Sequence, residues 1–259
     1  MRITARFHER ILARERLAGT FLNLGSPLVA EIAGCAGFDW LPIDLEHGVG
    51  GEESLLSQLH AAGTTPAAPV VRIAANEVAR FKRALDLGAS GVMVPWVNSA
   101  NEARAAVAAF RYPPRGVRGV TKFMRACEFG ADFNEYFVRA NDRLVLMTQI
   151  ETADAVENIE EIAAVEGIDV LFIGPMDLTT CLGIQGQFEH PRFRDAVAKT
   201  CETAARAGKA TGILSLNPAL LPLCDEFGIT VIALGADDGA VNAAMHASAA
   251  AIRKGTTRD

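Results

Sequence analysis

The chain has 259 residues, of which 50% are hydrophobic and 22% are charged, so it is long enough to bury a large core. Its formal net charge of -6 argues against a general binder of nucleic acid or of anionic membranes, because both need a positive field. No apolar stretch approaches the ~20 residues that cross a bilayer. The composition therefore favours a globular protein with a small-molecule partner, built as one large α/β domain or two small ones.

The amino-terminal segment, residues 1–19, is rich in arginine and superficially similar to a transit peptide. Glu9 and Glu15 interrupt it and no apolar signal core follows, so we expect a surface helix there. The five cysteines are widely scattered and form no Cys-x-x-Cys pair. This pattern favours a reducing cytoplasm.

Short strand-like runs alternate with segments that have helical periodicity or room for a helix. The eight runs lie near residues 19, 39, 68, 91, 143, 168, 209 and 229. Ser99 and Glu102 form a capping-box pattern, and Gly88 stands where a helix-terminating glycine is expected. Eight strand-helix units in about 250 residues predict a (β/α)8 barrel, because a doubly wound sheet usually needs fewer strands or a second domain.

No linker, low-complexity tract or short-period repeat marks a domain boundary. We therefore expect a single barrel domain over residues 1–259. The one long interruption, at about 112–142, is predicted to be a functional loop with a short helix. A C-terminal helix is expected at about 236–254, and its small and apolar residues suit packing on its own barrel or on a neighbouring chain.

Polar side chains gather at the predicted carboxyl ends of several strands, where the loops of such a barrel converge on one mouth. They are Asp44, Glu46 and His47 after the second strand, Arg72 after the third, Gln149 and Glu151 after the fifth, and Asp177 after the sixth. Singly, each has an ordinary explanation, such as a helix N-cap for Asp177. Together they predict a site, because structural accidents would scatter over both ends of the strands.

The residue types in this cluster indicate its chemistry. Carboxylates from neighbouring strands offer an oxygen-rich site for Mg²⁺ or Mn²⁺. A histidine and an arginine beside them suggest acid-base chemistry on an anion. The segment HGVGGEE lacks the third glycine of a dinucleotide loop, and neither G-x-S-x-G nor H-E-x-x-H occurs. Because no lysine is well placed for a Schiff base, carbonyl chemistry should depend on a metal.

Four segments, DLEHG, VVRI, QIET and FIGPMDL, together resemble the HpcH/HpaI aldolase family of class II pyruvate aldolases, in an order and spacing that span nearly the whole chain. The family includes 4-hydroxy-2-oxoheptanedioate and 2-dehydro-3-deoxyglucarate aldolases. The resemblance implies a TIM barrel of the phosphoenolpyruvate/pyruvate-binding type, assembled as a homo-hexamer. It also implies reversible cleavage of 4-hydroxy-2-oxoacids to pyruvate and an aldehyde through a metal-stabilised pyruvate enolate, in aromatic or sugar acid catabolism.

The resemblance assigns roles to the clustered residues. Glu151 and Asp177 match the two metal-binding carboxylates, with Mg²⁺ or Mn²⁺ as the expected ion and Co²⁺ as a further candidate. Arg72 matches the arginine that stabilises the enolate. His47 matches the base, and imidazole exchanges protons near neutral pH. Gln149 and the backbone at Met176 match groups that hold pyruvate, together with Arg72 and Asp177.

Asp86 matches an acid that raises the basicity of the histidine, but we expect it near the carboxyl end of a helix, opposite the mouth. Three explanations stay open: Asp86 acts from a neighbouring chain, Asp44 is the residue that orients His47, or Asp86 is an ordinary solvated residue. On the acceptor side, Asn23 and Leu214 follow strands at positions where an aldehyde would pass. Arg125, like Arg118 in the same loop, either meets an acceptor carboxylate or phosphate or serves only solubility.

Two alternative functions accompany the aldolase hypothesis. One is a CoA-ester lyase of the same barrel group, although the short carboxyl terminus offers no evident surface for CoA. The other is a non-catalytic 2-oxoacid-binding protein, which would not require the base His47. The physiological aldehyde and the stereochemistry of the reaction are not predicted by the sequence.

Overall fold

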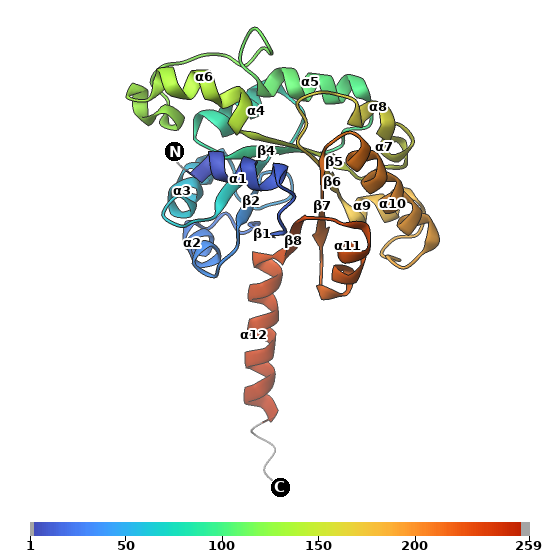
Figure 1. Ribbon diagram of the computed structural model, residues 1–259. Helices are drawn as coiled ribbons and strands as arrows, with labels where there is room; N and C mark the ends of the chain where they lie inside the picture. The colour runs from blue at the N-terminus through green and yellow to red at the C-terminus, as the bar shows by residue number, and fades with distance from the viewer. Residues whose placement is uncertain (1–2, 255–259) are drawn as a thin grey trace.

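Eight parallel strands close into a barrel in the computed structural model, which describes residues 3–254 (Figure 1). The strands follow chain order around the barrel, and β1 pairs with β8 to close it. They are β1 Leu17–Phe21, β2 Trp40–Asp44, β3 Ala68–Arg72, β4 Gly91–Val94, β5 Val145–Ile150, β6 Val170–Ile173, β7 Ala210–Ser215 and β8 Val231–Ala236. The predicted (β/α)8 barrel is confirmed, with each strand in its predicted run.

Helices surround this barrel, except the last one, which projects away from it (Figure 1). They are α1 Ile3–Leu12, α2 Pro27–Cys35, α3 Glu52–Ala62, α4 Val78–Asp86, α5 Ala100–Phe110, α6 Phe133–Arg143, α7 Ala153–Glu157, α8 Ile159–Ala163, α9 Pro175–Cys181, α10 Pro191–Arg206, α11 Leu221–Phe227 and α12 Asp237–Lys254, with 3₁₀ turns η1 Arg125–Gly130 and η2 Pro218–Leu220. The Ser99 hydroxyl accepts the Glu102 amide at the start of α5, and Gly88 has a φ of +97° just after α4. The predicted start of α5 and the predicted end of α4 are therefore confirmed. None of the helices in the described residues is long and apolar enough to span a membrane.

The barrel interior is filled by large side chains, with the rings of Trp40 and Phe172 meeting edge to face at 5.9 Å. Gly19 faces the Trp40 ring so closely that an added Cβ would lie 2.5 Å from it. Helix α1 contributes Phe7 and Ile11 to the same buried cluster. The amino-terminal helix is therefore not simply a surface helix, because one of its faces packs against the barrel.

The long segment between α5 and β5 is more ordered than a loop with one short helix. It contains η1 and then the 11-residue helix α6. Arg118 is fully buried in it, with its guanidinium 4.3 Å from the centre of the Tyr112 ring. The buried apolar residues of this segment, among them Tyr112, Met124 and Tyr136, belong to the same core cluster as α4 and α5.

Helix α12 departs from the ring of helices and projects away from the barrel (Figure 1). Asp237, its first residue, is buried, but Val241, Met245 and Ile252 are 41%, 68% and 73% exposed. Exposed apolar side chains therefore stand along the length of this helix.

Candidate active site

The centre of the polar cluster is an ion pair between Arg72, the last residue of β3, and Asp44, the last residue of β2. Arg72 Nε and Nη2 donate to the two carboxylate oxygens of Asp44 at 2.8 and 2.6 Å. The Asp44 side chain is fully buried, and Arg72 also stacks 4.9 Å from the centre of the Phe21 ring. Burial by itself raises the pKa of Asp44, but the guanidinium outweighs it and holds the pKa below its usual range. Asp44 is therefore a permanent anion that fixes Arg72 in one orientation.

Asp44 also organises the loop that carries Glu46 and His47. Its Oδ1 accepts the amides of Glu46 at 3.0 Å and His47 at 3.4 Å. Glu46 Oε2 lies 3.1 Å from Arg72 Nη1 and 3.9 Å from His47 Nε2. The Glu46 side chain is 11% exposed, whereas the imidazole of His47 is 65% exposed. The histidine is thus held at the mouth with its ring open to substrate and solvent.

Glu151, which follows β5, is a buried carboxylate held by two donors. The Trp96 backbone N–H donates to Oε1 at 2.7 Å, and Gln149 Nε2 donates to Oε2 at 2.7 Å. Trp96 reaches this position with a φ of +54°, a strained conformation for a bulky residue. The strained backbone after β4 therefore serves to place an amide on Glu151.

Gly174, between β6 and α9, packs directly against the same carboxylate. A Cβ at this position would lie 2.5 Å from Glu151 Oε2, so only glycine fits. Asp177 stands in the first turn of α9 and is half-buried. Its charge contributes to raising the pKa of both Glu46 and Glu151, so the three carboxylates lie within electrostatic range of one another.

Burial dominates the electrostatics of these acids. It raises the pKa of Glu151 to about 7, with the Trp96 amide lowering it and the charges of Glu46 and Asp177 raising it further. The pKa of Glu46 is also raised, mainly by burial, against the opposing charge of Arg72. Four carboxylates around one guanidinium leave a net negative centre, which a divalent cation would partly neutralise.

The donor set fits a magnesium or manganese ion. Glu151 and Asp177 offer carboxylate oxygens, and the buried Oε1 of Gln149 has no hydrogen-bond partner in the structure. Within residues 3–254, no three His, Cys, Asp or Glu side chains are grouped so as to hold a metal alone. An ion bound here would therefore take the rest of its ligands from water and substrate.

Three further predicted residues stand at or near the carboxyl ends of the strands. The Asn23 amide N–H donates to Asp237 Oδ1 at 2.8 Å, and its side-chain Oδ1 is buried without a partner. Leu214, in β7, is half-buried and packs against the interior cluster. Met176 is the second residue of α9, beside Asp177, and is 36% exposed. These positions are compatible with the expected substrate contacts, which stay predictions.

Asp86 and Arg125 are not brought to the mouth of their own chain. Asp86 ends α4 and accepts a hydrogen bond from Arg118 Nη2 at 2.8 Å. Arg125 donates to the carbonyl oxygens of Leu87 at 2.7 Å and Leu59 at 3.5 Å, near the carboxyl ends of α4 and α3. These helix ends lie on the barrel face opposite the mouth. A catalytic role for Asp86 or an acceptor role for Arg125 would therefore need a second copy of the chain.

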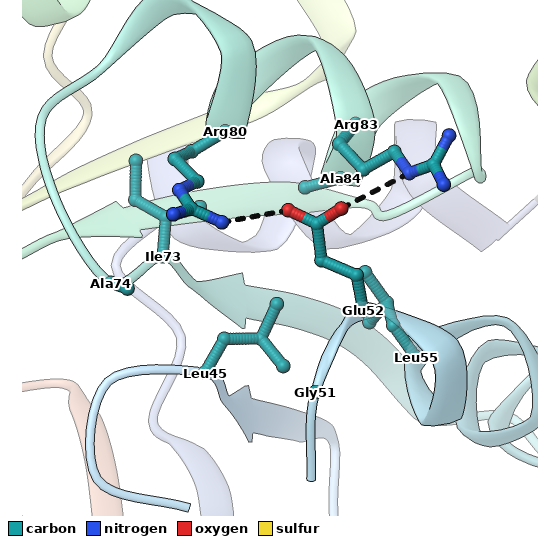
Figure 2. Close-up of a pocket in the computed structure, with 9 residues that line it drawn as sticks. All are labelled: Leu45, Gly51, Glu52, Leu55, Ile73, Ala74, Arg80, Arg83 and Ala84. Carbon is teal, nitrogen blue, oxygen red and sulfur yellow. Dashed lines mark hydrogen bonds and ion pairs between the residues drawn. The ribbon is translucent and has the colours of Figure 1, made fainter.

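A hollow between α3 and α4 lies behind the loop that carries His47. Figure 2 shows Glu52 reaching Arg80 and Arg83 across it, at 2.9 and 3.3 Å. Leu45, which precedes Glu46 in the loop, lines its floor. The hollow contains none of the clustered catalytic candidates, so we assign it to loop support.

The comparisons with known proteins agree with this geometry. Residues 17–244 match the family model described as HpcH/HpaI aldolase/citrate lyase. The chain belongs to the HpcH/HpaI aldolase/citrate lyase family. It is 40% identical over 232 residues to a hydroxypyruvate/pyruvate aldolase of Cupriavidus necator, a match that covers 89% of this chain and 86% of that protein.

Two other HpcH/HpaI relatives cover still more of the chain. A 5-keto-4-deoxy-D-glucarate aldolase of Shigella boydii is 37% identical over 249 residues, 96% of each protein. The crystal structure of a family protein from Burkholderia cenocepacia superposes with a TM-score of 0.91 at 36% identity, covering 96% of this chain and 99% of that one. The predicted family is confirmed, and the chain is an aldolase-type carbon–carbon lyase.

The sequence analysis did not identify Trp96 and Gly174 as site residues, and it assigned no role to Glu46. Trp96 acts through its backbone amide and Gly174 through the absence of a side chain. Glu46 stood in the motif DLEHG but received no function, although it completes the ion-pair network around Arg72. The Pro-Trp dipeptide at the end of the fourth predicted strand was the available signal for a constrained loop.

Proposed function

We propose that this chain is a metal-dependent class II aldolase that cleaves 4-hydroxy-2-oxoacids reversibly to pyruvate and an aldehyde. The observation that carries the proposal is the fixed guanidinium of Arg72, held by Asp44 at 2.6 and 2.8 Å among the carboxylates of Glu46, Glu151 and Asp177. Such a centre pairs a preorganised positive charge with ligands for a divalent cation.

Glu151 and Asp177 would hold Mg²⁺, Mn²⁺ or Co²⁺ in this proposal. The ion, when bound, supplies Lewis-acid polarisation of the substrate keto group. The Trp96 amide and Gln149 keep both oxygens of Glu151 in place, so little reorganisation is needed on binding. Gln149 and the backbone at Met176 would hold the pyruvate moiety.

Arg72 and His47 carry different parts of the reaction. Arg72 cannot lose its proton and cannot rotate away from Asp44, so it stabilises negative charge on the enolate oxygen throughout the cycle. His47 is exposed beside the partly buried Glu46, where its imidazole can take the proton from the aldol hydroxyl and return it in the reverse direction.

A CoA-ester lyase is the second candidate, because the matching family model also covers citrate lyases. Cleavage of an acyl-CoA thioester without any aldol cleavage would favour it. We further propose that the enzyme is a cytoplasmic homo-oligomer, expected to be a hexamer, that serves the catabolism of aromatic or sugar acids. The projecting helix α12 and its exposed apolar residues support the assembly.

Proton exchange on pyruvate tests the proposed function without any knowledge of the aldehyde. The protein is incubated with pyruvate in D₂O, with and without Mn²⁺, and the methyl group is followed by NMR after removal of the metal. Exchange that depends on the metal supports enolate formation. No exchange with several divalent metals would leave a 2-oxoacid-binding protein as the better explanation.

A further inference from the structure

The loop that carries His47, residues 45–51, has to place the imidazole through its backbone. The ring is 65% exposed, and the 3.9 Å between its Nε2 and Glu46 Oε2 is beyond hydrogen-bond distance. Asp44 Oδ1 accepts the Glu46 amide at 3.0 Å and the His47 amide at the longer distance of 3.4 Å. A further restraint on this loop therefore bears directly on the position of the base.

The same loop is held on its other side by residues 22–25, which follow β1. The Val49 amide donates to the carbonyl oxygen of Asn23 at 2.8 Å. A Cβ on Gly25 would lie 2.8 Å from the Gly50 Cα, so the two backbones are in close contact there. A displacement of Asn23 would consequently displace the loop that carries the base.

Asp237, the first residue of α12, fixes the position of Asn23. It is 6% exposed, and its Oδ1 accepts the amides of Asn23 at 2.8 Å, Leu24 at 3.3 Å and Asp238 at 2.8 Å. Its Oδ2 accepts the Leu24 amide, also at 3.3 Å. The Asn23 side-chain amide donates to Asp238 Oδ2 at 3.3 Å. The start of α12 is thus joined to the backbone segment that holds the His47 loop.

The position of Asp237 requires an acceptor oxygen rather than a negative charge. Burial raises the pKa of this carboxyl, against the amides of Asn23, Leu24 and Asp238, which lower it. All three amides donate to Oδ1. The side-chain oxygen of an asparagine can stand in the place of Oδ1 and accept the same donors.

We infer that Asp237 is a positioning residue for the base His47, acting through the backbone of Asn23 and Val49. The inference rests on the proposed aldolase function and adds a residue to its machinery. Asp237 needs no contact with substrate, because it acts by setting where the imidazole stands relative to the aldol hydroxyl. Its loss should therefore impair aldol cleavage more than decarboxylation, which does not need His47.

Hydrogen exchange followed by mass spectrometry tests the restraint without any measurement of activity. Asp237→Ala should speed amide exchange in the segment 45–51, whereas Asp237→Asn should stay close to the parent protein. Asp169→Ala is the matched control. Asp169 Oδ2 also accepts a backbone amide, that of Leu146 at 2.8 Å, but directly before β6, at the opposite end of the barrel. The control should leave exchange in 45–51 unchanged.

Kinetics at saturating Mn²⁺, with 4-hydroxy-2-oxoheptanedioate and oxaloacetate as substrates, test the effect on the base. Asp237→Ala should lower kcat for aldol cleavage by about 10- to 100-fold, because a displacement of about 1 Å can cost about 100-fold. Decarboxylation should fall much less. Asp237→Asn should restore most of the cleavage rate, and Asp169→Ala should leave the ratio of the two rates unchanged. In a His47→Ala background, Asp237→Ala should cause no further loss, since residues that act as a unit are not additive.

Three results would overturn the inference and leave the proposed function in place. They are unchanged exchange of the segment 45–51 in Asp237→Ala, an equal loss of cleavage and decarboxylation, and a fully additive loss in the His47→Ala background. The last two would mean that Asp237 serves only general stability. Failure of the proposed function looks different, because the parent protein would then show no metal-dependent proton exchange on pyruvate, and the inference would be refuted with it.

Discussion

Replacing Glu151 by glutamine should stabilise the metal-free protein at pH 8 and at the same time abolish binding of the divalent cation. Glu151 is buried, and its pKa is raised to about 7 from an ordinary 4.5, first by burial and then by Glu46 and Asp177. The folded state therefore holds the proton more tightly than the unfolded chain does. Stability from this group is present at low pH and is lost as pH rises through about 7.

The magnitude follows from the difference between the two pKa values. At about 1.36 kcal/mol per pKa unit, ionisation of Glu151 costs about 3 kcal/mol at pH 8 and less than about 1 kcal/mol at pH 5. Glutamine has no such cost and fits the same contacts. It can accept the Trp96 amide, and its own NH₂ can donate to Gln149 Oε1, which is buried without a partner, once the Gln149 amide turns over.

The assay is urea unfolding of both proteins in the presence of a chelator, at pH 5 and pH 8. Glu151→Gln should be more stable than the parent by about 2 to 3 kcal/mol at pH 8 and nearly equal to it at pH 5. Glu189→Gln is the control, because that carboxylate is 81% exposed and its loss should change little. A gain of the same size at both pH values, or no gain at pH 8, would refute the burial argument. Mn²⁺ titration of Glu151→Gln should show no binding at the site.

Three other outcomes are expected. Asp177→Ala should lose metal-dependent activity with an unchanged circular-dichroism spectrum, and near-normal turnover at low metal would contradict its role as a ligand. Arg72→Ala should reduce the rates of aldol cleavage and of oxaloacetate decarboxylation alike, by about 100- to 1,000-fold at saturating Mn²⁺. His47→Ala, measured under the same conditions, should reduce the rate of aldol cleavage far more than the rate of decarboxylation. Light scattering at micromolar concentration should give the mass of an oligomer, and deletion of the helical segment 241–254 should lower that mass. If the parent protein is a monomer, Asp86 can have no role across subunits.

The sequence predicted the barrel well because its strands are short and apolar and because segments with helical periodicity separate them. Once the barrel is accepted, the polar residues that follow those strands must meet, since parallel strands in a closed barrel share one carboxyl end. Asp44 and Arg72 could therefore be placed together, although their hydrogen bonds could not be foreseen. The amphipathic spacing of Phe7 and Ile11 was also present in the sequence, and it explains why α1 packs on the barrel rather than lying free on the surface.

The unpredicted part of the site depends on backbone geometry and on packing between distant segments. The amide of Trp96 has no side-chain signature, and the need for Gly174 arises only when Glu151 stands against it. Arg118 and Arg125 look alike in a polar loop. Their surroundings, aromatic rings for one and helix carbonyls for the other, are set by tertiary packing that no local pattern encodes.

The position of each residue in the fold also determines how many substitutions it tolerates. A substitution at Asp44 leaves a buried guanidinium without its main partner, so this position is constrained by folding as well as by chemistry. Val49 and Leu216 have exposed side chains, and replacing them disturbs no buried hydrogen bond. The fold therefore constrains Asp44 far more tightly than the exposed loop positions Val49 and Leu216. Mutational scanning should accordingly show few permitted residues at Asp44 and many at Val49, even when selection is for stability alone.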